Sequence, residues 1–114
     1  MADEVAVVQG TLDVIILKAL SWRPQHGYAV SRWVKDTTDG ALDLEEGALY
    51  PALHRLERRG LVASEWGLSE NNRKAKYYRI TADGRRHLRA EAAAWQRYAA
   101  MLGKVLAAQA PGAA

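Results

Sequence analysis

The sequence has no cysteine, and it has no apolar run long enough to cross a membrane. The first absence excludes disulfides and cysteine metal sites, which fits a reducing cytoplasm. The second matters because a membrane-spanning helix needs about 18 or more consecutive apolar residues. The first ten residues, MADEVAVVQG, also lack the basic start and the small-residue cleavage site of a signal peptide. These absences predict a cytoplasmic protein with no membrane segment.

A catalytic set is also missing. There is no cysteine nucleophile and no glycine-rich phosphate loop. The three histidines, His26, His54 and His87, are scattered and lack the spacing of a metal site or a catalytic triad. We therefore expect neither enzyme activity nor a bound metal or cofactor.

The charge that is present is unevenly distributed. Residues 51–90 hold ten Lys or Arg and four Asp or Glu, whereas the rest of the chain holds six and nine. A positive middle-to-late region suits a polyanionic partner, nucleic acid first. An ordinary solvated basic face explains the same charge equally well, so charge alone leaves both interpretations open.

The first half of the chain has helical periodicity. Residues 10–24 predict a helix that Thr11 caps and Pro24 ends. Residues 26–40 predict a second helix that ends at Gly40, and a short extended link follows. The third predicted helix begins near Glu45 or Glu46, after an Asp43 to Glu46 capping box, and ends at Gly60. The apolar positions predicted to face the core are Leu12, Ile15, Ile16, Ala19 and Leu20, then Val30, Trp33 and Val34, then Leu49, Leu53 and Leu56.

After Gly60 the pattern changes to that of a hairpin. LVASEW and AKYYRI have the composition of strands, and the polar loop between them contains Asn71 and Asn72, a residue type that tolerates positive φ. Three helices followed by a hairpin is the plan of a winged helix-turn-helix, in which the third helix enters the major groove and the hairpin forms the wing. The expected fold class is mainly α with a two-stranded β-wing.

A long helix follows, with Thr81 as its expected cap. Its apolar residues form a stripe that extends about five turns beyond the hairpin, where this chain has little left to cover it. Such a stripe is usually core, but here a homodimer is the simpler explanation. The residues predicted to form the dimer interface are Leu88, Ala92, Trp95, Tyr98, Ala99, Leu102 and Leu106. The predicted division is a DNA-binding domain with a short N-terminal extension (1–82), a dimerisation helix (83–108) and a frayed tail (109–114).

The third helix has an outer arc suited to reading DNA. Pro51 lies on this arc near the start of the helix, where the hydrogen bond it forfeits costs least. His54 can bond to a base edge, Arg can pair with guanine, and Tyr50 can reach a phosphate. The alternative is a solvated face whose basic residues complement the helix dipole, which we prefer for Arg59. The predicted DNA contacts of this helix are Tyr50, Pro51, His54, Arg55 and Arg58, with Arg58 expected to contact a phosphate.

The hairpin loop carries charge of the same sign. Arg73, Lys74 and Lys76 lie near Asn72, and basic side chains on such a loop can neutralise phosphates or enter a narrow minor groove. The alternative is an ordinary polar turn. Trp22, Trp33 and Trp66 are expected to be packing residues.

Several motifs together resemble those of the PadR family of bacterial transcriptional regulators. They are GTLDVIILKAL, HGYAVSRWV, EEGALYPALHRLERRGLV and EWGLSENNRKAKYYRITADGR, followed by the tryptophan-bearing helix. The resemblance implies a homodimeric repressor in the bacterial cytoplasm, associated with the nucleoid when it is bound to a palindromic operator. It also implies release by a small aromatic or hydrophobic effector held between the C-terminal helices. The expected effector site is Trp95, Ala99 and Ile15, and the alternative for Trp95 is that it only packs the dimer.

A function of a different class remains open. The dimer could be an aromatic small-molecule binder or a protein-interaction module that keeps the winged helix as a scaffold, because a fold alone does not settle function. A protein-binding version would expose apolar residues on the third helix, whereas this helix carries Tyr50, His54, Arg55 and Arg58. Those residues favour DNA.

Overall fold

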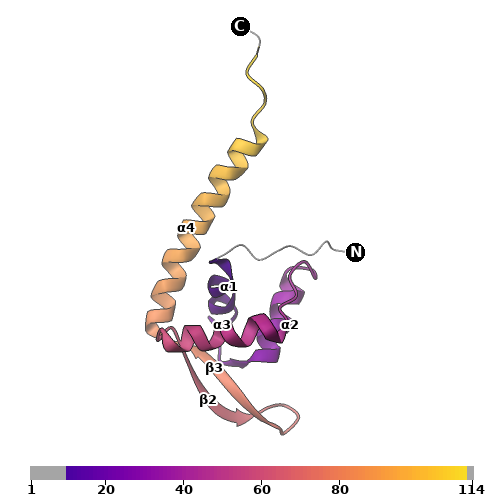
Figure 1. Ribbon diagram of the computed structural model, residues 1–114, viewed down its shortest axis with the longest axis vertical. Coiled ribbons are helices and arrows are strands. Elements are labelled where there is room, and N and C mark those ends of the chain that lie inside the picture. Colours follow the sequence, from indigo (N-terminus) through magenta and orange to yellow (C-terminus); the bar gives the residue numbers. More distant parts are fainter. Residues whose placement is uncertain (1–9, 113–114) are drawn as a thin grey trace.

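The computed structural model describes residues 10–112, so the predicted N-terminal extension and the last two residues of the tail lie outside it. Figure 1 shows three short helices gathered into a head, a hairpin that extends from it, and a long helix that leaves it in the opposite direction. The elements are α1 (Thr11–Ala19), β1 (Gln25–His26), α2 (Gly27–Thr37), α3 (Glu46–Arg58), β2 (Val62–Leu68), β3 (Lys74–Ile80) and α4 (Ala82–Ala107).

The core of the head lies between α1, α2 and α3. The predicted inward positions of α3, Leu49, Leu53 and Leu56, are almost completely buried, which confirms the helical periodicity. Val30 and Val34 of α2 are buried against them, while Trp33 is only partly buried. The remaining buried apolar side chains are Ile16, Leu17, Ala19, Leu20, Leu42, Leu44, Ala52, Leu61, Val62, Tyr78, Ile80 and Leu88.

Two details of α1 differ from prediction. Thr11 is the first helical residue and the cap position belongs to Gly10, whose φ of 92° suits a residue without a side chain. The helix ends at Ala19, well before Pro24, so the proline is not what stops it. Instead, the side chain of Gln25 donates to the Ala19 carbonyl over 2.6 Å and satisfies a group that the helix end leaves free.

A third strand was not predicted. Gln25 and His26 pair antiparallel with Tyr78 and Tyr77 of β3, which makes a three-stranded sheet in the order β1-β3-β2. Two residues are too short to show alternation, so this strand has no sequence pattern. The helix that follows, α2, ends at Thr37, three residues before the predicted stop at Gly40.

The hairpin is confirmed, with longer strands than expected. β2 and β3 pair from Val62 with Ile80 to Leu68 with Lys74. The loop is therefore only Ser69 to Arg73, and Asn72 in it adopts a φ of 58°, the positive value that asparagine tolerates. Apart from the extra strand, the fold is the predicted winged helix with a C-terminal helix.

The start of α3 is confirmed at Glu46, but the predicted capping box is wrong. Glu45 occupies the cap position and its side chain makes no capping hydrogen bond. Asp43 instead forms an ion pair with Lys35 of α2, with 3.5 Å between the carboxylate oxygen and the ammonium nitrogen. Pro51 lies inside the helix and is exposed, as predicted.

Thr81 is the cap of α4, as predicted, and it joins this helix to the head. Its hydroxyl accepts from the Gly84 amide over 3.0 Å and donates to the Gly60 carbonyl over 2.7 Å. Gly84 packs so closely that an added Cβ would lie 2.1 Å from the Leu61 carbonyl oxygen. The predicted division into a DNA-binding domain (1–82), a dimerisation helix (83–108) and a frayed tail (109–114) stays a prediction.

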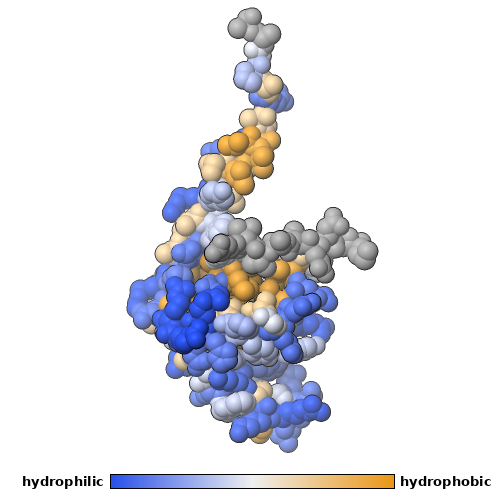
Figure 2. Space-filling model, in the orientation of Figure 1, coloured by the Kyte–Doolittle hydropathy of each residue, from blue (hydrophilic) through white to orange (hydrophobic). Residues whose placement is uncertain are grey.

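Beyond Leu88, α4 leaves the head. Figure 2 shows hydrophobic residues on its distal part, away from the body of the molecule. No helix among residues 10–112 has the length and apolar content needed to span a membrane.

Candidate nucleic-acid interface

The outer arc of α3 is exposed along its length. Pro51, His54 and Arg58 lie opposite the buried leucines and form the centre of this arc. No ion pair holds Arg58 anywhere in the described part of the chain, and its guanidinium is exposed. The centre of α3 therefore offers donors without an internal competitor.

One flank of α3 faces the wing. The Tyr50 ring lies over the start of α2, so close that a Cβ at Gly27 would be 2.5 Å from its hydroxyl oxygen. Tyr50 and His54 share a groove of about 550 Å³ with Lys74 and Lys76 of β3. The structure thus brings together four of the predicted DNA-binding residues from two separate elements. The rest of the groove is lined by His26, Gly27, Tyr28, Trp66, Ser69, Ala75 and Tyr78.

Two basic side chains of the wing, Arg73 and Lys74, lie on exposed positions, whereas Lys76 is half-buried. The Lys74 ammonium lies 5.1 Å from the centre of the Trp66 ring, which is a cation–π distance. Trp66 itself is 62% exposed and Trp22 is 58% exposed, so the expectation that these two are packing residues is wrong. Arg73 and Asn72 lie at the exposed tip of the loop. A broad aromatic surface therefore accompanies the charges of the wing.

A carboxylate ties α3 to the wing on the same flank. Glu57 accepts a short hydrogen bond from the Ser64 hydroxyl of β2, and one of its oxygens lies 4.0 Å from the Lys76 ammonium. Burial raises the pKa of the nearby Tyr78 hydroxyl above its ordinary value, and the charge of Glu57 adds to the shift. The folded protein thus favours the neutral form of this hydroxyl.

The other flank of α3 faces α1. Arg55 donates to one oxygen of Asp13 over 2.6 Å, and Arg59 donates to the other over 3.0 Å. Arg55, a predicted DNA contact, is therefore held by a carboxylate of the protein. Arg59, which was expected to complement only the helix dipole, has the same partner.

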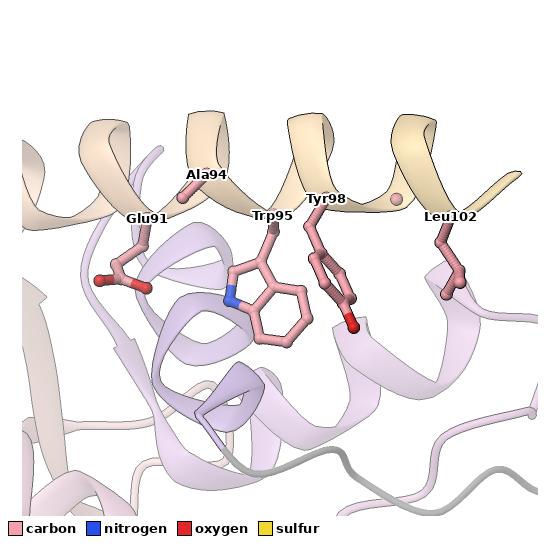
Figure 3. A pocket seen from close by; sticks show the side chains of 6 residues that line it. Glu91, Ala94, Trp95, Tyr98 and Leu102 are labelled. Atoms are coloured by element: carbon pink, nitrogen blue, oxygen red, sulfur yellow. The ribbon is translucent and has the colours of Figure 1, made fainter. Parts of the chain in front are cut away.

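The exposed face of α4 forms a second candidate site. Glu91, Trp95, Tyr98 and Leu102 project from one side of the helix, and with Ala94 and Ala99 they line an open groove of about 710 Å³ (Figure 3). The Trp95 and Tyr98 rings meet edge to face, with 5.9 Å between their centres. The surface of this groove is mostly apolar and aromatic.

The structure separates one predicted effector residue from the others. Trp95 and Ala99 line the groove on α4, whereas Ile15 lines a different groove of about 240 Å³ between α1 and α2, together with Trp33 and Leu42. Within one chain, Ile15 does not contribute to the Trp95 groove.

The predicted dimer interface on α4 is exposed to solvent along most of its length. Tyr98 is 53% exposed, Leu106 is 75% exposed, and Leu102 is also open to solvent. Leu88 differs, because it is buried in the core of its own chain and has little surface left for a second one. Ala92 and Trp95 are half-buried.

Sequence reasoning missed four residues that shape these surfaces. Asp13 and Glu57 hold the two flanks of α3, Trp66 widens the wing surface, and His26 caps α2 by accepting from the Ala29 amide over 3.1 Å. The contacts of Asp13 join residues 42 and 46 positions apart, whereas His26 caps α2 through an amide only three residues further on. Only the Thr-Asp pair at residues 11–13, at the start of a helix, could have drawn attention to Asp13.

Comparison with known proteins agrees with the fold. Residues 16–90 match the model of a family described as the transcriptional regulator PadR-like family. A protein of Lysinibacillus sphaericus with uncharacterised function is 32% identical over 82 residues, which are 72% of this chain and 75% of that protein.

Solved structures give the same result. A transcriptional regulator from Clostridium thermocellum superposes with a TM-score of 0.76 at 31% identity, covering 84% of this chain and 93% of that one. A PadR family transcriptional regulator from Eggerthella lenta has a TM-score of 0.72 at 38% identity, covering 89% of this chain and 86% of that one.

Proposed function

The chain belongs to the PadR-like family of transcriptional regulators, and from this premise we propose that it is a dimeric repressor that binds an inverted-repeat operator. The observation that carries the proposal is the basic groove in which Tyr50 and His54 of α3 meet Lys74 and Lys76 of the wing. A protein that reads DNA with a helix and a wing needs these two elements to present polar and cationic groups on one side.

The central arc of α3 is proposed to enter the major groove. Arg58 can donate two hydrogen bonds to a guanine, and His54 can bond to a base edge. Pro51 presents a donor-free apolar surface beside them, which suits contact with a thymine methyl group. Tyr50, at the edge of the wing groove, is placed to reach a phosphate, and Arg55 to approach the backbone on the opposite flank.

The wing is proposed to hold the flanking DNA backbone. Arg73, Lys74 and Lys76 can each neutralise a phosphate, and Asn72 can donate to one. The exposed Trp66 ring beside Lys74 adds a flat apolar surface that can lie against a deoxyribose. These contacts position the protein on the duplex and carry no base information themselves.

Dimerisation is proposed to run through α4. Its bare apolar stripe is too long for its own head to cover, and a second α4 would bury it. Two heads in a symmetric dimer would then contact half-sites one helical turn, about 34–36 Å, apart. We include Ala92, Trp95, Tyr98, Ala99, Leu102 and Leu106 in the interface.

An aromatic effector is proposed to occupy the groove at Trp95. The Trp95 and Tyr98 rings offer faces for a planar molecule, and the Glu91 carboxylate at the rim can accept a hydrogen bond or pair with a cation. Because this groove lies on the same face as the proposed interface, a ligand there would change how the two chains meet. Such a change would alter the separation of the heads and weaken operator binding.

A salt titration of DNA binding tests the main proposal. We expect the logarithm of the binding constant for a labelled duplex to fall steeply with the logarithm of the salt concentration, by about 0.9 for each phosphate contact. Arg73→Ala should reduce the slope by about this amount. Arg97→Ala, an exposed arginine on α4, is the matched control and should leave the slope unchanged. Binding that is insensitive to salt would refute the DNA reading.

Fluorescence tests the effector groove separately. A panel of planar aromatic molecules is added to the wild-type protein and to Trp95→Phe, with Trp22→Phe as the control. We expect at least one compound to quench the wild type and the control, and to lose its effect in Trp95→Phe. Quenching that survives in Trp95→Phe, or its absence across a broad panel, would contradict the groove assignment.

A further inference from the structure

Asp13 bridges the two arginines on the α1 flank of α3 with separate oxygens. It belongs to the first turn of α1, where the N-terminal end of the helix favours a negative charge. Its side chain is only 16% exposed, whereas the side chain of Arg55 is 46% exposed. The carboxylate is thus enclosed, while the guanidinium of Arg55 still faces solvent.

The three arginines of this helix end are therefore unequal. Arg58 points from the centre of the outer arc with no acidic partner in residues 10–112. Arg55 and Arg59 share one carboxylate, whose oxygens lie 2.6 Å from Arg55 and 3.0 Å from Arg59, so the flank carries two positive charges and one negative charge. A phosphate approaching this flank meets a net charge of about one rather than two, and it meets the carboxylate as a competitor.

We propose that Asp13 is a positioning residue that restrains Arg55 and Arg59 and so lowers the affinity of α3 for DNA of any sequence. The proposal rests on the DNA-binding function proposed above. The ion pair leaves the central arc of Pro51, His54 and Arg58 untouched, and these are the side chains suited to base edges. Asp13 thereby increases the ratio of operator binding to non-specific binding, because it weakens mainly the contacts that carry no sequence information.

Asp13→Asn tests this inference because it keeps the size of the side chain and removes its charge. The probe is a labelled duplex of mixed sequence, so no operator is needed. We expect Asp13→Asn to bind it about tenfold more tightly at about 0.05 M salt, with a slope steeper by about 0.9 per chain. Adding Arg55→Gln to Asp13→Asn should cancel most of the gain.

Asp83→Asn is the matched control. Asp83 forms an ion pair with Arg86 on α4, so this variant also removes one carboxylate and releases one arginine, but neither partner belongs to α3. We expect it to change the affinity by less than about twofold at the same salt concentration. Equal gains in the two variants would mean that only net charge matters, and would overturn the inference.

If Asp13 has a purely structural role, Asp13→Asn should weaken DNA binding instead of tightening it. Loosening of α3 would weaken binding and leave the salt slope unchanged, and that result in a folded Asp13→Asn protein overturns the proposal. If Asp13→Asn does not fold, Arg55→Gln is compared in the wild type with Arg73→Gln, which removes a proposed phosphate contact that has no acidic partner in residues 10–112. We expect the slope to fall by about 0.9 for Arg73→Gln and by less than half of that for Arg55→Gln. Equal losses would refute the restraint.

The wild-type titration separates the two proposals. If the wild type binds the duplex with a steep salt dependence and Asp13→Asn does not tighten binding, only the role of Asp13 fails. If the wild type does not bind duplex DNA, the proposed function fails, and the inference fails with it.

Discussion

The third helix and the distal part of the fourth carry similar apolar patterns but have different surroundings. Leu49, Leu53 and Leu56 repeat at helical spacing, and all three are buried by α1, α2 and the sheet. Leu102 and Leu106 also repeat at helical spacing, yet they face solvent. Apolar periodicity thus indicates that one face of a helix is buried, but it does not indicate whether the same chain or a second chain buries it.

The largest expected effect is on the free energy of unfolding, and it differs between variants of α3 and of α4. Leu53→Ala should cost about 2–5 kcal/mol of unfolding free energy at every protein concentration, because it leaves a cavity in the head. Leu106→Ala should cost less than about 0.5 kcal/mol when the chain is dilute, and more when it is concentrated enough to pair. Urea denaturation over a range of protein concentrations measures both. Equal losses that do not depend on concentration would contradict the comparison.

A charge on the α4 stripe should come next in size. Leu102→Glu would place a carboxylate in the proposed interface of each chain and weaken self-association by at least about 2 kcal/mol, or roughly thirtyfold in Kd. Ala100→Glu adds the same group to an exposed position on the opposite side of α4 and is the matched control. Analytical ultracentrifugation gives both constants. Unchanged association of Leu102→Glu would remove α4 from the interface.

The junction between head and helix should respond more modestly. Thr81→Ala removes the acceptor for the Gly84 amide and the donor to the Gly60 carbonyl. We expect a loss of about 1 kcal/mol, the usual cost of a missing helix cap. Thr37→Ala, at the exposed last residue of α2, should have a smaller effect. Thermal unfolding of the two variants measures the difference, and equal shifts would argue against the capping role.

The smallest expected effect is a pH dependence confined to the head. The pKa of Tyr78 is raised in the folded state above the ordinary tyrosine value of about 10. The neutral hydroxyl therefore contributes stability that is fully present below about pH 10 and is lost as the pH rises further. Unfolding free energy should therefore decline above about pH 10 in the wild type and decline less in Tyr78→Phe. Tyr98→Phe, on α4, is the control. An identical alkaline decline in all three proteins would refute the assignment.

The sequence predicted what depends on local periodicity and on neighbouring residues. The three leucines of α3, the Thr81 cap and the positive φ of Asn72 all follow from patterns a few residues long. The two-residue strand at Gln25 has no such pattern, and it forms only because β3 offers a free edge.

Contacts between distant elements could not be predicted in the same way. Asp13 and Arg55 are 42 residues apart, and their pairing depends on how α1 crosses α3. Arg55 lies at the side of the outer arc of α3, where the orientation of the helix decides whether the side chain faces solvent or α1. Trp66 was expected to be a packing residue, although its strand presents it on an open face. Ile15 was predicted to share an effector site with Trp95, but the two residues line different grooves.

The length of α4 makes it a lever. A helix of 26 residues is about 39 Å long, so a rotation of about 5° at one end moves the other by roughly 3 Å. Its fixed end is Thr81, whose hydroxyl is bonded to the Gly60 carbonyl just after α3 (Figure 1). A small rotation at the distal end of α4 would therefore shift α3 by a distance comparable to the rise between neighbouring base pairs of DNA.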